Sequence, residues 1–410
     1  RPAGDEVRKA RPSGGPFVYP PVLRKLRCMY GVYDFGLMLA DSVRTEAYMR
    51  ALRQAVTPGC TVLEIGTGTG LFAMLARKWG AGRVFAVEVL DTIDLAPQVA
   101  QANGIAEGIE FIKGFSTRME LPVKADVLVS DLRGTLPLYR MHLPSIIDAR
   151  ERLMVPDGVQ IPQRDRICGA VVEAPSMFRR LQGPWESDRF DLDHSVVSSV
   201  AANTWRRWRQ ADMADAKSLT SPAEWATVDY TRVLEPHCSG DMQWTIERAG
   251  TAHGLNLWFD ATLLHGIEYS TAPDGPELVY GNAFFPLRHP VEVDKGDEIR
   301  CSLRADLIGG RYTWTWRTSI LSDGSGPVEY AQSTFYSTPL GTRDVAAQEL
   351  DHAPRLATEG RLLGTALQLM DGSRTLEVIA AELERDFPSR FNEWDSAIAW
   401  VRHLSREYGD

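Results

Sequence analysis

This 410-residue sequence lacks the features that would place it in a membrane, outside the cell or on nucleic acid. No apolar run approaches the roughly 18 residues that a membrane-spanning helix needs, so we expect no membrane partner. The Pro/Gly/Arg-rich segment 1–21 has no apolar stretch and no initiator Met, so we expect a trimmed start without a secretory signal. The net charge of −9 argues against broad nucleic-acid binding.

Cysteine is scarce and scattered. The five cysteines form no C-x-x-C pair; they are Cys28, Cys60, Cys168, Cys238 and Cys301. We therefore expect reduced structural thiols in a cytoplasmic protein, and no metal site. The hydrophobic fraction of 44% and the charged fraction of 24% are typical of a globular protein, and the length is enough for two or three domains.

Hydrophobic periodicity divides the first half of the chain into two blocks. Residues 22–58 predict helices with an apolar stripe. Residues 59–160 alternate strands and helices, which indicates a doubly wound α/β parallel sheet. The expected strands lie near 61–65, 83–88, 109–112 and 125–130, and the expected helices near 71–79, 94–102 and 140–153. Ligands of such sheets bind beyond the carboxyl ends of the strands.

The pattern changes from about residue 161 onward. Short alternating strands, separated by Gly, Pro and Asp, predict an antiparallel barrel or sandwich. The expected strands lie near 166–173, 225–233, 241–248, 253–261, 276–284, 298–306 and 312–320. A Trp/Arg-rich helical insertion is expected near 176–212. Residues 321–350 predict a linker, and residues 355–410 predict helices again.

The most informative segment is the glycine loop of residues 62–70, where an apolar strand runs into Gly66, Gly68 and Gly70. Glycine lets the backbone turn sharply and approach a ligand closely. A second predicted strand ends in Glu88, whose carboxylate can accept both hydroxyls of a ribose. The G-x-G-x-G spacing, preceded by Glu64, resembles the S-adenosylmethionine site of class I methyltransferases.

A longer resemblance begins before this loop. Residues 38–45, Met-Leu-Ala-Asp-Ser-Val-Arg-Thr, resemble the M-L-x-D-x-x-R-T segment of protein arginine methyltransferases. The similarity continues through Val87-Glu88, Lys113-Gly114, Glu120-Leu121-Pro122, Ser130-Asp131-Leu132-Arg133-Gly134 and Pro156-Asp157-Gly158, and spans about residues 25–340. It implies an S-adenosylmethionine domain, a β-barrel with a helical dimerisation arm, and a homodimer.

The resemblance also implies roles for individual residues. Arg44 is expected to bind the methionyl carboxylate through its two-donor fork, and Glu88 to hold the ribose. The implied cofactor-binding residues are Met38, Arg44, Glu64, Gly66, Thr67, Gly68, Gly70, Glu88 and Thr117. The implied domains are an N-terminal extension with cofactor-covering helices (1–58), an S-adenosylmethionine-binding domain (59–160), a β-barrel substrate domain with its arm near 176–212 (161–345), and a helical domain (355–410).

The chain departs from the family where the acceptor binds. The family uses two glutamates to clamp the substrate guanidinium, and this chain has Asp131 and Arg140 at those positions. The family's Thr-His-Trp loop is replaced by residues 278–280, Leu-Val-Tyr. Thr117 stands for an adenine-side glutamate, and Phe35 for a substrate-side histidine. A guanidinium stays cationic, so an arginine in its clamp predicts an altered acceptor pocket.

The expected catalytic residues are Asp131, Arg140 and His142. Asp131 is the candidate for orienting the acceptor or removing a proton. Arg140 has three open interpretations: an ion pair with Asp131, a site for an anionic part of the acceptor, or a solvent-facing side chain. His142 and Tyr139 lie close in sequence and could act as base or hydrogen-bond partner, although a solvated or capping histidine is an alternative.

The C-terminal segment resembles PqqD-type domains, which present precursor peptides to tailoring enzymes. The similarity rests on the D-G-x-x-T-x-x-x-I-A-x-x-L string of residues 371–383. Thr375 is expected to cap the second helix. A packed accessory domain and a winged helix that binds DNA are alternatives, although acidic residues on the second helix disfavour contact with phosphates.

Taken together, the sequence predicts a cytoplasmic, homodimeric, S-adenosylmethionine-dependent methyltransferase. The expected acceptor is a peptide or natural-product precursor, methylated on nitrogen or oxygen. Genuine arginine methylation is one alternative. A methyltransferase-like peptide-binding protein without turnover is another, although the retained cofactor residues disfavour it.

Overall fold

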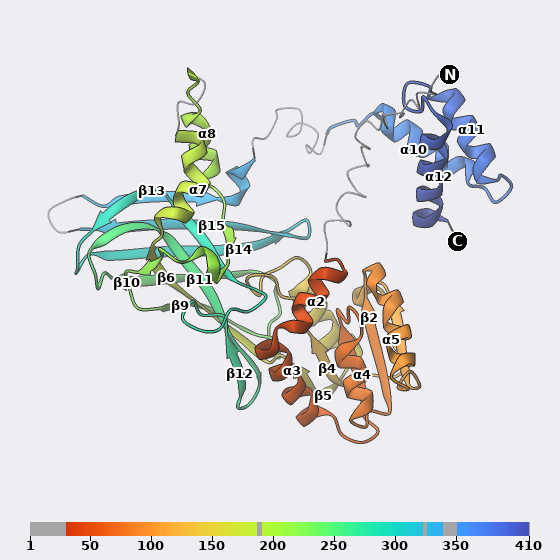
Figure 1. Ribbon diagram of the computed structural model, residues 1–410, viewed down its shortest axis with the longest axis horizontal. Helices are drawn as coiled ribbons and strands as arrows, with labels where there is room; N and C mark the ends of the chain where they lie inside the picture. The colour runs from red at the N-terminus through yellow and green to blue at the C-terminus, as the bar shows by residue number, and fades with distance from the viewer. Residues whose placement is uncertain (1–29, 187–190, 323–325, 339–350, 410) are drawn as a thin grey trace, which may run out of the picture. The chain divides into compact units, whose positions relative to one another are not determined.

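The computed structural model describes residues 30–186, 191–322, 326–338 and 351–409. The chain forms two compact units, Arg1–Thr338 and Pro339–Asp410. Each unit has its own cluster of buried hydrophobic side chains. Figure 1 shows the helices and strands of both units.

A five-stranded parallel sheet, in the order β3-β2-β1-β4-β5, forms the first half of the larger unit. Its strands are β1 (Thr61–Ile65), β2 (Arg83–Glu88), β3 (Ile109–Lys113), β4 (Ala125–Ser130) and β5 (Met154–Ile161). The four predicted strands are confirmed. The fifth was missed because Pro156-Asp157-Gly158, which is typical of a turn, lies inside β5.

Helices and short turns precede β1 and join the parallel strands. They are α2 (Val32–Ala40), α3 (Ser42–Ala55), α4 (Leu71–Lys78), the 3-10 turns η1 (Asp91–Leu95) and η2 (Ser116–Arg118), α5 (Ala96–Ala102), α6 (His142–Asp148) and the π-helical turn η3 (Ala149–Leu153). α3 buries Tyr48, Ala51 and Leu52 at helical spacing. The predicted helices near 71–79, 94–102 and 140–153 are confirmed. Residues 22–29 lie outside the described residues.

The register of the parallel sheet brings three predicted site positions together. Ile65 at the end of β1 pairs with Val87 of β2 and with Ser130 of β4. Gly66, Glu88 and Asp131, at or just beyond these strand ends, therefore lie at one edge of the sheet. The strand order reverses at β1, between β2 and β4, which is where open α/β sheets bind their ligands.

The second half of the larger unit is antiparallel. One four-stranded sheet has the order β10-β14-β15-β16, and a seven-stranded sheet has the order β7-β13-β11-β6-β8, with β12 on β11 and β9 on β6. The strands are β6 (Arg164–Glu173), β7 (Arg206–Trp208), β8 (Lys217–Ser218), β9 (Ala223–Asp229), β10 (Cys238–Thr245), β11 (Gly250–Leu264), β12 (Ile267–Ser270), β13 (Asn282–Val293), β14 (Glu298–Ile308), β15 (Arg311–Leu321) and β16 (Val328–Ser333).

Two details of the antiparallel prediction are wrong. Within the described ranges the strands form two separate hydrogen-bonded sheets, so the closed-barrel alternative is wrong and the sandwich alternative is not contradicted. Part of the expected linker is structured, because β16 pairs with β15 and the turn η6 (Thr334–Ser337) follows it. β16 was missed because its flanks are rich in Gly, Ser and Pro and it lies at a sheet edge.

The insertion near 176–212 is only partly helical. α7 (Pro175–Glu186) and α8 (Ser195–Ala201) form a helical arm that projects from the sheets in Figure 1. The strand β7 and the turn η5 (Gln210–Asp212) follow. Trp205 packs against the ring of Phe285 at 6.0 Å, and Trp208 is 1% exposed. Trp208 therefore belongs to the core of the sheets, and the partly buried Trp205 packs against that core.

The smaller unit is helical, with α10 (Thr358–Leu369), α11 (Leu376–Asp386) and α12 (Trp394–Tyr408). Ile379, Leu383, Trp400 and Leu404 bury their side chains in one cluster. The Thr375 hydroxyl accepts the backbone N–H of Val378 at 3.4 Å, which confirms the predicted cap. Across the described parts of the chain, no helix is long and apolar enough to cross a membrane.

Candidate functional site

A cavity of about 480 Å³ opens at the carboxyl edge of the parallel sheet. The α2–α3 segment, the loops after β1, β2, β3 and β4, and residues of the antiparallel half all line it. One continuous hydrophobic cluster runs through both halves of the larger unit. The cavity walls from the two halves are therefore fixed relative to each other.

The glycine loop shapes the cavity wall. Gly68 has φ +55°, and a Cβ built there would lie 2.4 Å from Cε1 of Phe35. Only glycine therefore lets α2 close over this loop. Gly66 and Thr67 line the cavity, whereas Gly68 and Gly70 do not. Gly70 instead supplies the left-handed residue that begins α4.

Two buried glutamates hold this loop. Glu88 accepts backbone N–H groups from Gly68 at 3.0 Å, Val89 at 2.8 Å and Leu90 at 3.1 Å. Oε2 of Glu64 accepts the Thr67 hydroxyl at 2.6 Å and the Ala73 N–H at 2.7 Å. Burial raises the pKa of Glu64 to about 8. Both glutamates line the cavity, and Glu64 also ties β1 to the first turn of α4.

Arg44 enters the cavity from the first turn of α3. Asp41 caps this helix by accepting the Arg44 N–H at 3.1 Å, and its other oxygen accepts the N–H of Val279 at 2.8 Å. The Arg44 guanidinium donates through Nη1 to the carbonyl of Met38 at 3.2 Å and through Nε to Asp131 at 2.5 Å. No partner for Nη2 is found among the described residues. Nη2 of Arg44 therefore remains available to bind a ligand.

Asp131 is bound by groups of its own chain. Oδ2 accepts from Arg44 Nε and from the Tyr280 hydroxyl, each at 2.5 Å, and Oδ1 accepts from Arg133 Nη1 at 3.2 Å. Burial opposes its ionisation, but Arg44, Arg133 and the Tyr280 hydrogen bond outweigh burial and lower the pKa of Asp131. Burial raises the pKa of Tyr280, so this hydroxyl is a donor.

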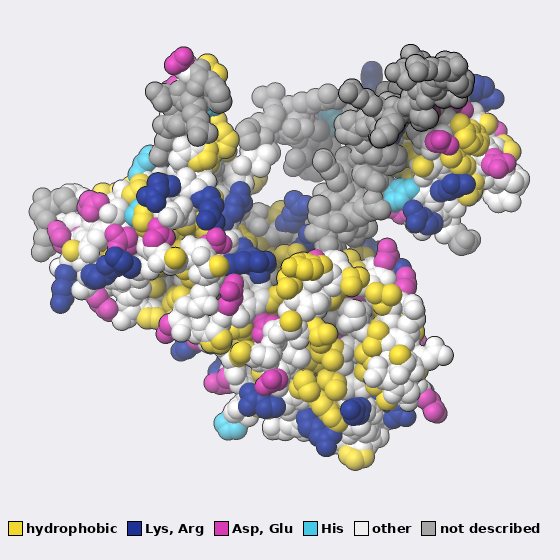
Figure 2. All heavy atoms as spheres, viewed as in Figure 1, with side chains coloured by type: hydrophobic (Ala, Val, Ile, Leu, Met, Phe, Trp, Pro, Cys, Tyr) yellow, Lys and Arg dark blue, Asp and Glu magenta, His cyan; other side chains and the backbone are white. Residues whose placement is uncertain are grey.

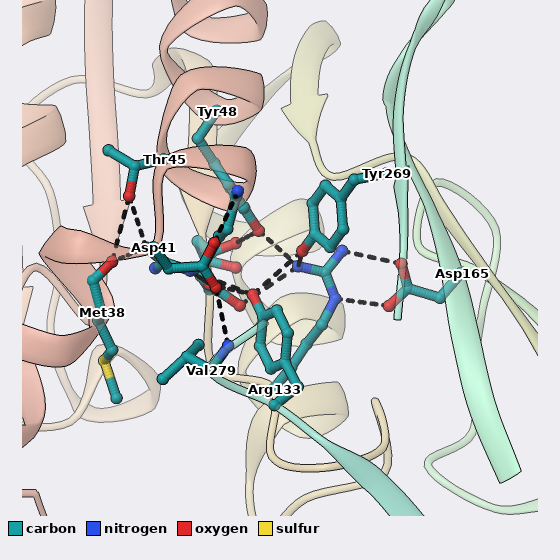
Figure 3. Close-up of polar contacts among 12 residues, drawn as sticks. Met38, Asp41, Thr45, Tyr48, Arg133, Asp165, Tyr269 and Val279 are labelled. Carbon is teal, nitrogen blue, oxygen red and sulfur yellow. Dashed lines mark hydrogen bonds and ion pairs between the residues drawn. The ribbon is translucent and has the colours of Figure 1, made fainter. Parts of the chain in front are cut away.

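A second acid balances Arg133 on the other side (Figure 3). Asp165 of β6 accepts two guanidinium hydrogen bonds from Arg133, at 2.6 and 2.8 Å. The Tyr230 hydroxyl donates to Asp165 at 2.5 Å. Arg133 also contacts the hydroxyls of Tyr48 at 2.5 Å and Tyr269 at 3.3 Å. Two arginines and two aspartates thus form a buried, charge-balanced network across the two halves of the unit.

This network was largely unpredictable from the sequence. Arg133 and Tyr280 lie within motifs of the family resemblance that carry no predicted role for them, and Tyr48 was expected only as part of an apolar helix stripe. Asp165, Tyr230 and Tyr269 were not predicted as site residues. Asp165 stands between Arg164 and Arg166 at the charged start of β6, ahead of its apolar stretch, so it does not stand out in the sequence as a buried acid. An acid there needs a buried partner, but the sequence does not say which one.

Arg140 does not pair with Asp131. In the described part of the chain Arg140 has no ion pair, and its guanidinium lies 5.4 Å from the ring of its neighbour Tyr139. Its φ of +45° is rare for a long side chain. The side chain lines the cavity. Of the three interpretations, the ion pair with Asp131 is therefore wrong.

His142 is buried at the start of α6, with 2% of its surface exposed. Its Nδ1 lies 2.7 Å from the carbonyl of Pro137, and Nε2 has no hydrogen-bond partner among the residues that the structure describes. Burial lowers the pKa of His142 to about 4. The ring is neutral near pH 7, and the alternative of a solvated histidine is wrong.

The remaining expected cofactor residues differ in position. Met38 lines the cavity, and Thr117 does not, although Phe115 and Ser116 beside it do. The cavity is also lined by Trp205, Arg207 and Arg209. Their place here was not predicted from the sequence, because their segment was expected to be a helical insertion. Within the described ranges, no group of three or more His, Cys, Asp or Glu side chains could hold a metal ion.

Comparisons with known proteins match this arrangement. Residues 163–307 match the model of the arginine methyltransferase oligomerization subdomain, and residues 43–136 match that of ribosomal protein L11 methyltransferase. An arginine N(omega)-methyltransferase of Streptomyces achromogenes subsp. streptozoticus is 33% identical over 273 residues, covering 65% of this chain and 74% of the relative. The chain belongs to the arginine methyltransferase family.

Other family members agree. Protein arginine N-methyltransferase 6 of Xenopus tropicalis is 28% identical, over 67% of this chain and 83% of its own length. A chain of the same fold occurs in the solved structure of the Trypanosoma brucei PRMT1 enzyme-prozyme heterotetrameric complex with AdoHcy. The two chains superpose with a TM-score of 0.67 and are 21% identical, over 74% of this chain and 98% of that one. Our chain is accordingly an enzyme, an S-adenosylmethionine-dependent methyltransferase.

The cavity fits this cofactor. Arg44, whose Nη2 has no partner among the described residues, lines the cavity together with Glu88 at the end of β2. The glycine loop lies between them, and its Gly68 N–H donates to Glu88. A guanidinium suits a carboxylate, and the strand-end acid suits ribose hydroxyls. Individual contacts with the cofactor remain proposals, which are developed below.

Proposed function

We propose that this enzyme methylates nitrogen or oxygen of an acceptor other than a protein arginine, presented within a peptide or natural-product precursor. The supporting observation is the state of Asp131. This residue stands where the family has a glutamate that clamps the substrate guanidinium, yet its carboxylate is already bound by Arg44, Arg133 and Tyr280. Little of its charge is left for an incoming cation.

The second clamp position strengthens this proposal. Arg140 lines the cavity without an ion-pair partner among the described residues. A substrate guanidinium keeps its positive charge at all relevant pH values. Two like charges about 4 Å apart repel by about 4 kcal/mol at an effective dielectric constant near 20. The pocket that attracts a guanidinium elsewhere in the family is therefore expected to repel one here.

The proposed roles of this chain's residues follow from their contacts. The cofactor supplies an activated methyl group on its sulfonium, so the protein must mainly orient, bind and exclude water. Arg44 would bind the methionyl carboxylate through Nη2, and Glu88 would hold the ribose. Asp131 and Tyr280 would position Arg44. Since Asp131 is ion-paired and has a lowered pKa, we assign it positioning rather than proton removal.

The test is a methyl-transfer assay with an arginine-containing peptide and the matched peptide in which glutamine replaces arginine. We expect no difference between the two with the wild-type enzyme, because the clamp is occupied. Arg140→Glu should add arginine-dependent turnover. Arg118→Glu, at an exposed position that does not line the cavity, is the control. Efficient arginine methylation by the wild-type protein would refute the proposal.

Genuine arginine methylation is the second candidate, and the similarity to the arginine N(omega)-methyltransferase of Streptomyces favours it. For this activity the Asp131 carboxylate must release the guanidinium of Arg133 or Arg44 and bind that of the substrate instead. The same peptide assay distinguishes the two candidates.

We also propose that the enzyme forms a homodimer through the α7–α8 arm. The matched oligomerization subdomain contains this arm. Val196 is 79% exposed and Leu192 57% exposed, and hydrophobic side chains show on the arm in Figure 2. Light scattering should report a dimer, and Val196→Asp should yield monomers. A wild-type monomer at all concentrations would contradict this proposal.

Two further proposals concern the smaller unit and the compartment. The capped α11 and its buried Ile379 and Leu383 support a PqqD-like domain that presents a peptide. If so, truncation after Thr338 should lower kcat/KM for a peptide acceptor and leave cofactor affinity unchanged.

The proposed compartment rests on the cysteines. Four of them are free thiols, Cys60, Cys168, Cys238 and Cys301, which supports a reducing compartment such as the cytoplasm. Fractionation of cells that express the protein tests this location.

A further inference from the structure

Three arginines line the cavity without an acidic partner: Arg140, Arg207 and Arg209, which we call the arginine wall. None of them forms an ion pair among the residues that the structure describes, whereas Arg44 and Arg133, in the same cavity, are both paired. Asp34 also lines the cavity, but its Oδ2 accepts the Gly31 N–H at 2.8 Å at the start of α2. Glu277 is a second acid whose charge acts on Arg207, so the wall sets three positive charges against these two carboxylates.

The strand β7 aims two of these side chains at the cavity. Successive residues of a strand point to opposite faces. Trp208 is buried, with its ring 5.3 Å from that of Phe284, so Arg207 and Arg209 face the other way. The Arg207 guanidinium donates through Nη2 to the carbonyl of Val279. A carbonyl orients a guanidinium but does not neutralise it, and the other nitrogens of Arg207 have no hydrogen-bond partner among the described residues.

The arginine wall lies next to the reacting part of the site. Val279 precedes Tyr280, whose hydroxyl donates to Asp131. Burial, together with Tyr139 and Asp131, raises the pKa of Tyr30 to about 12, and the nearby charge of Arg207 opposes this rise. Burial and the neighbouring charge of Arg209 lower the pKa of Arg207. Tyr30, Glu277 and Asp34 act in the opposite direction but do not outweigh burial and Arg209, so the nearby acids only partly compensate the charge of Arg207.

We propose that the arginine wall binds an oxyanion of the methyl acceptor, either a carboxylate or a phosphate. The inference rests on the proposed function insofar as the acceptor occupies this cavity. Guanidinium groups hold such anions through paired, charge-assisted hydrogen bonds. An anionic anchor also explains why the second clamp position carries arginine, since Arg140 then attracts the acceptor instead of repelling it.

The test is ligand binding to the full-length protein loaded with S-adenosylhomocysteine, measured by ligand-observed NMR without turnover. The probes are N-acetylglutamate, inorganic phosphate, the uncharged N-acetylglutamine amide and the cationic N-acetylarginine amide. We expect N-acetylglutamate or phosphate to bind, which identifies the anion, and the two amides not to. Arg207→Gln and Arg209→Gln should each weaken this binding by about five-fold, a modest factor because both side chains are exposed.

Arg206→Gln is the matched control, since Arg206 lies on the same strand, is exposed and does not line the cavity. It should leave anion binding unchanged. Equal binding of the uncharged amide, or tighter binding of the arginine amide, overturns the inference. These results need no methyl transfer. An enzyme that methylates arginine peptides yet binds anions would refute the proposed function and leave the arginine wall intact.

Discussion

Asp131 shows how one residue can keep its chemistry and change its task. The carboxylate remains at the end of β4, but two arginines and a tyrosine of the same chain bind it. Its side chain is 6% exposed, and that of Arg44 is 8% exposed. A buried ion pair is costly to break from one side, because the partner is left charged and unpaired.

Asp131→Asn should therefore affect both stability and cofactor binding. We expect a loss of about 3 kcal/mol in the free energy of unfolding and weaker S-adenosylhomocysteine binding, because Arg44 loses its anchor. Denaturation and calorimetry measure the two effects. Asp260→Asn, which breaks a more exposed ion pair with Arg166, should cost no more than about 1 kcal/mol. Unchanged stability and cofactor affinity with lost turnover would instead return Asp131 to proton removal.

His142 makes stability depend on pH in a defined direction. Its pKa falls from 6.5 to about 4 in the folded protein. Between these values the unfolded histidine binds a proton and the folded one does not, so lowering the pH favours unfolding. The loss amounts to roughly 1.4 kcal/mol per pH unit at most. Above 6.5 this contribution to stability is fully present.

His142→Asn should remove that part of the pH dependence, because asparagine offers Pro137 a donor and does not titrate. The measurement is urea denaturation across the interval from pH 6.5 to 4. His265→Asn, on an exposed turn, serves as the control and should follow the wild-type slope. A variant at position 142 that also follows that slope would show that this ring is protonated in the folded state.

At the scale of elements, the glycine loop depends on the helix above it. Gly68 leaves the space that Phe35 of α2 fills. Gly104 offers a matched comparison: its φ is +66°, and a Cβ there would meet nothing within 4 Å. Gly104→Ala should therefore cost only the left-handed backbone strain, about 1–2 kcal/mol.

Gly68→Ala should cost more than Gly104→Ala, because its Cβ displaces Phe35 as well. We also expect it to lower S-adenosylhomocysteine affinity by about ten-fold, and the Gly104 variant to leave that affinity unchanged. Thermal denaturation and calorimetry of both variants test this. Equal effects of the two substitutions would mean that α2 does not need the space above the loop.

The elements also show what sequence reasoning can reach. The strands near Gly66, Glu88 and Asp131 were predictable, because apolar runs and their polar ends are local patterns. The ion pair between Arg133 and Asp165 was not, since it depends on how β6 returns to the edge of the parallel sheet. Arg207 was placed in a helix because the three residues of β7 are too few to show alternation.

At the scale of the whole molecule, the chain consists of two separately packed units. The smaller unit buries its own cluster, including Leu362, Ile379 and Trp400. We therefore expect two transitions in calorimetric unfolding. Truncation after Thr338 should abolish one of them, and added S-adenosylhomocysteine should raise only the other. One cooperative transition, shifted as a whole by the ligand, would show that the units unfold together.

The pairing of Arg133 with Asp165 has an evolutionary consequence. The arginine belongs to the nucleotide-binding half and the aspartate to the first strand of the other half. Recombination between homologous genes anywhere from codon 133 to codon 165 would place Arg133 and Asp165 in different hybrids. Each of these buried charges is stable only when its partner is present. Hybrids that lose one member carry a stranded charge inside the protein, so the two halves are expected to be inherited as a single block.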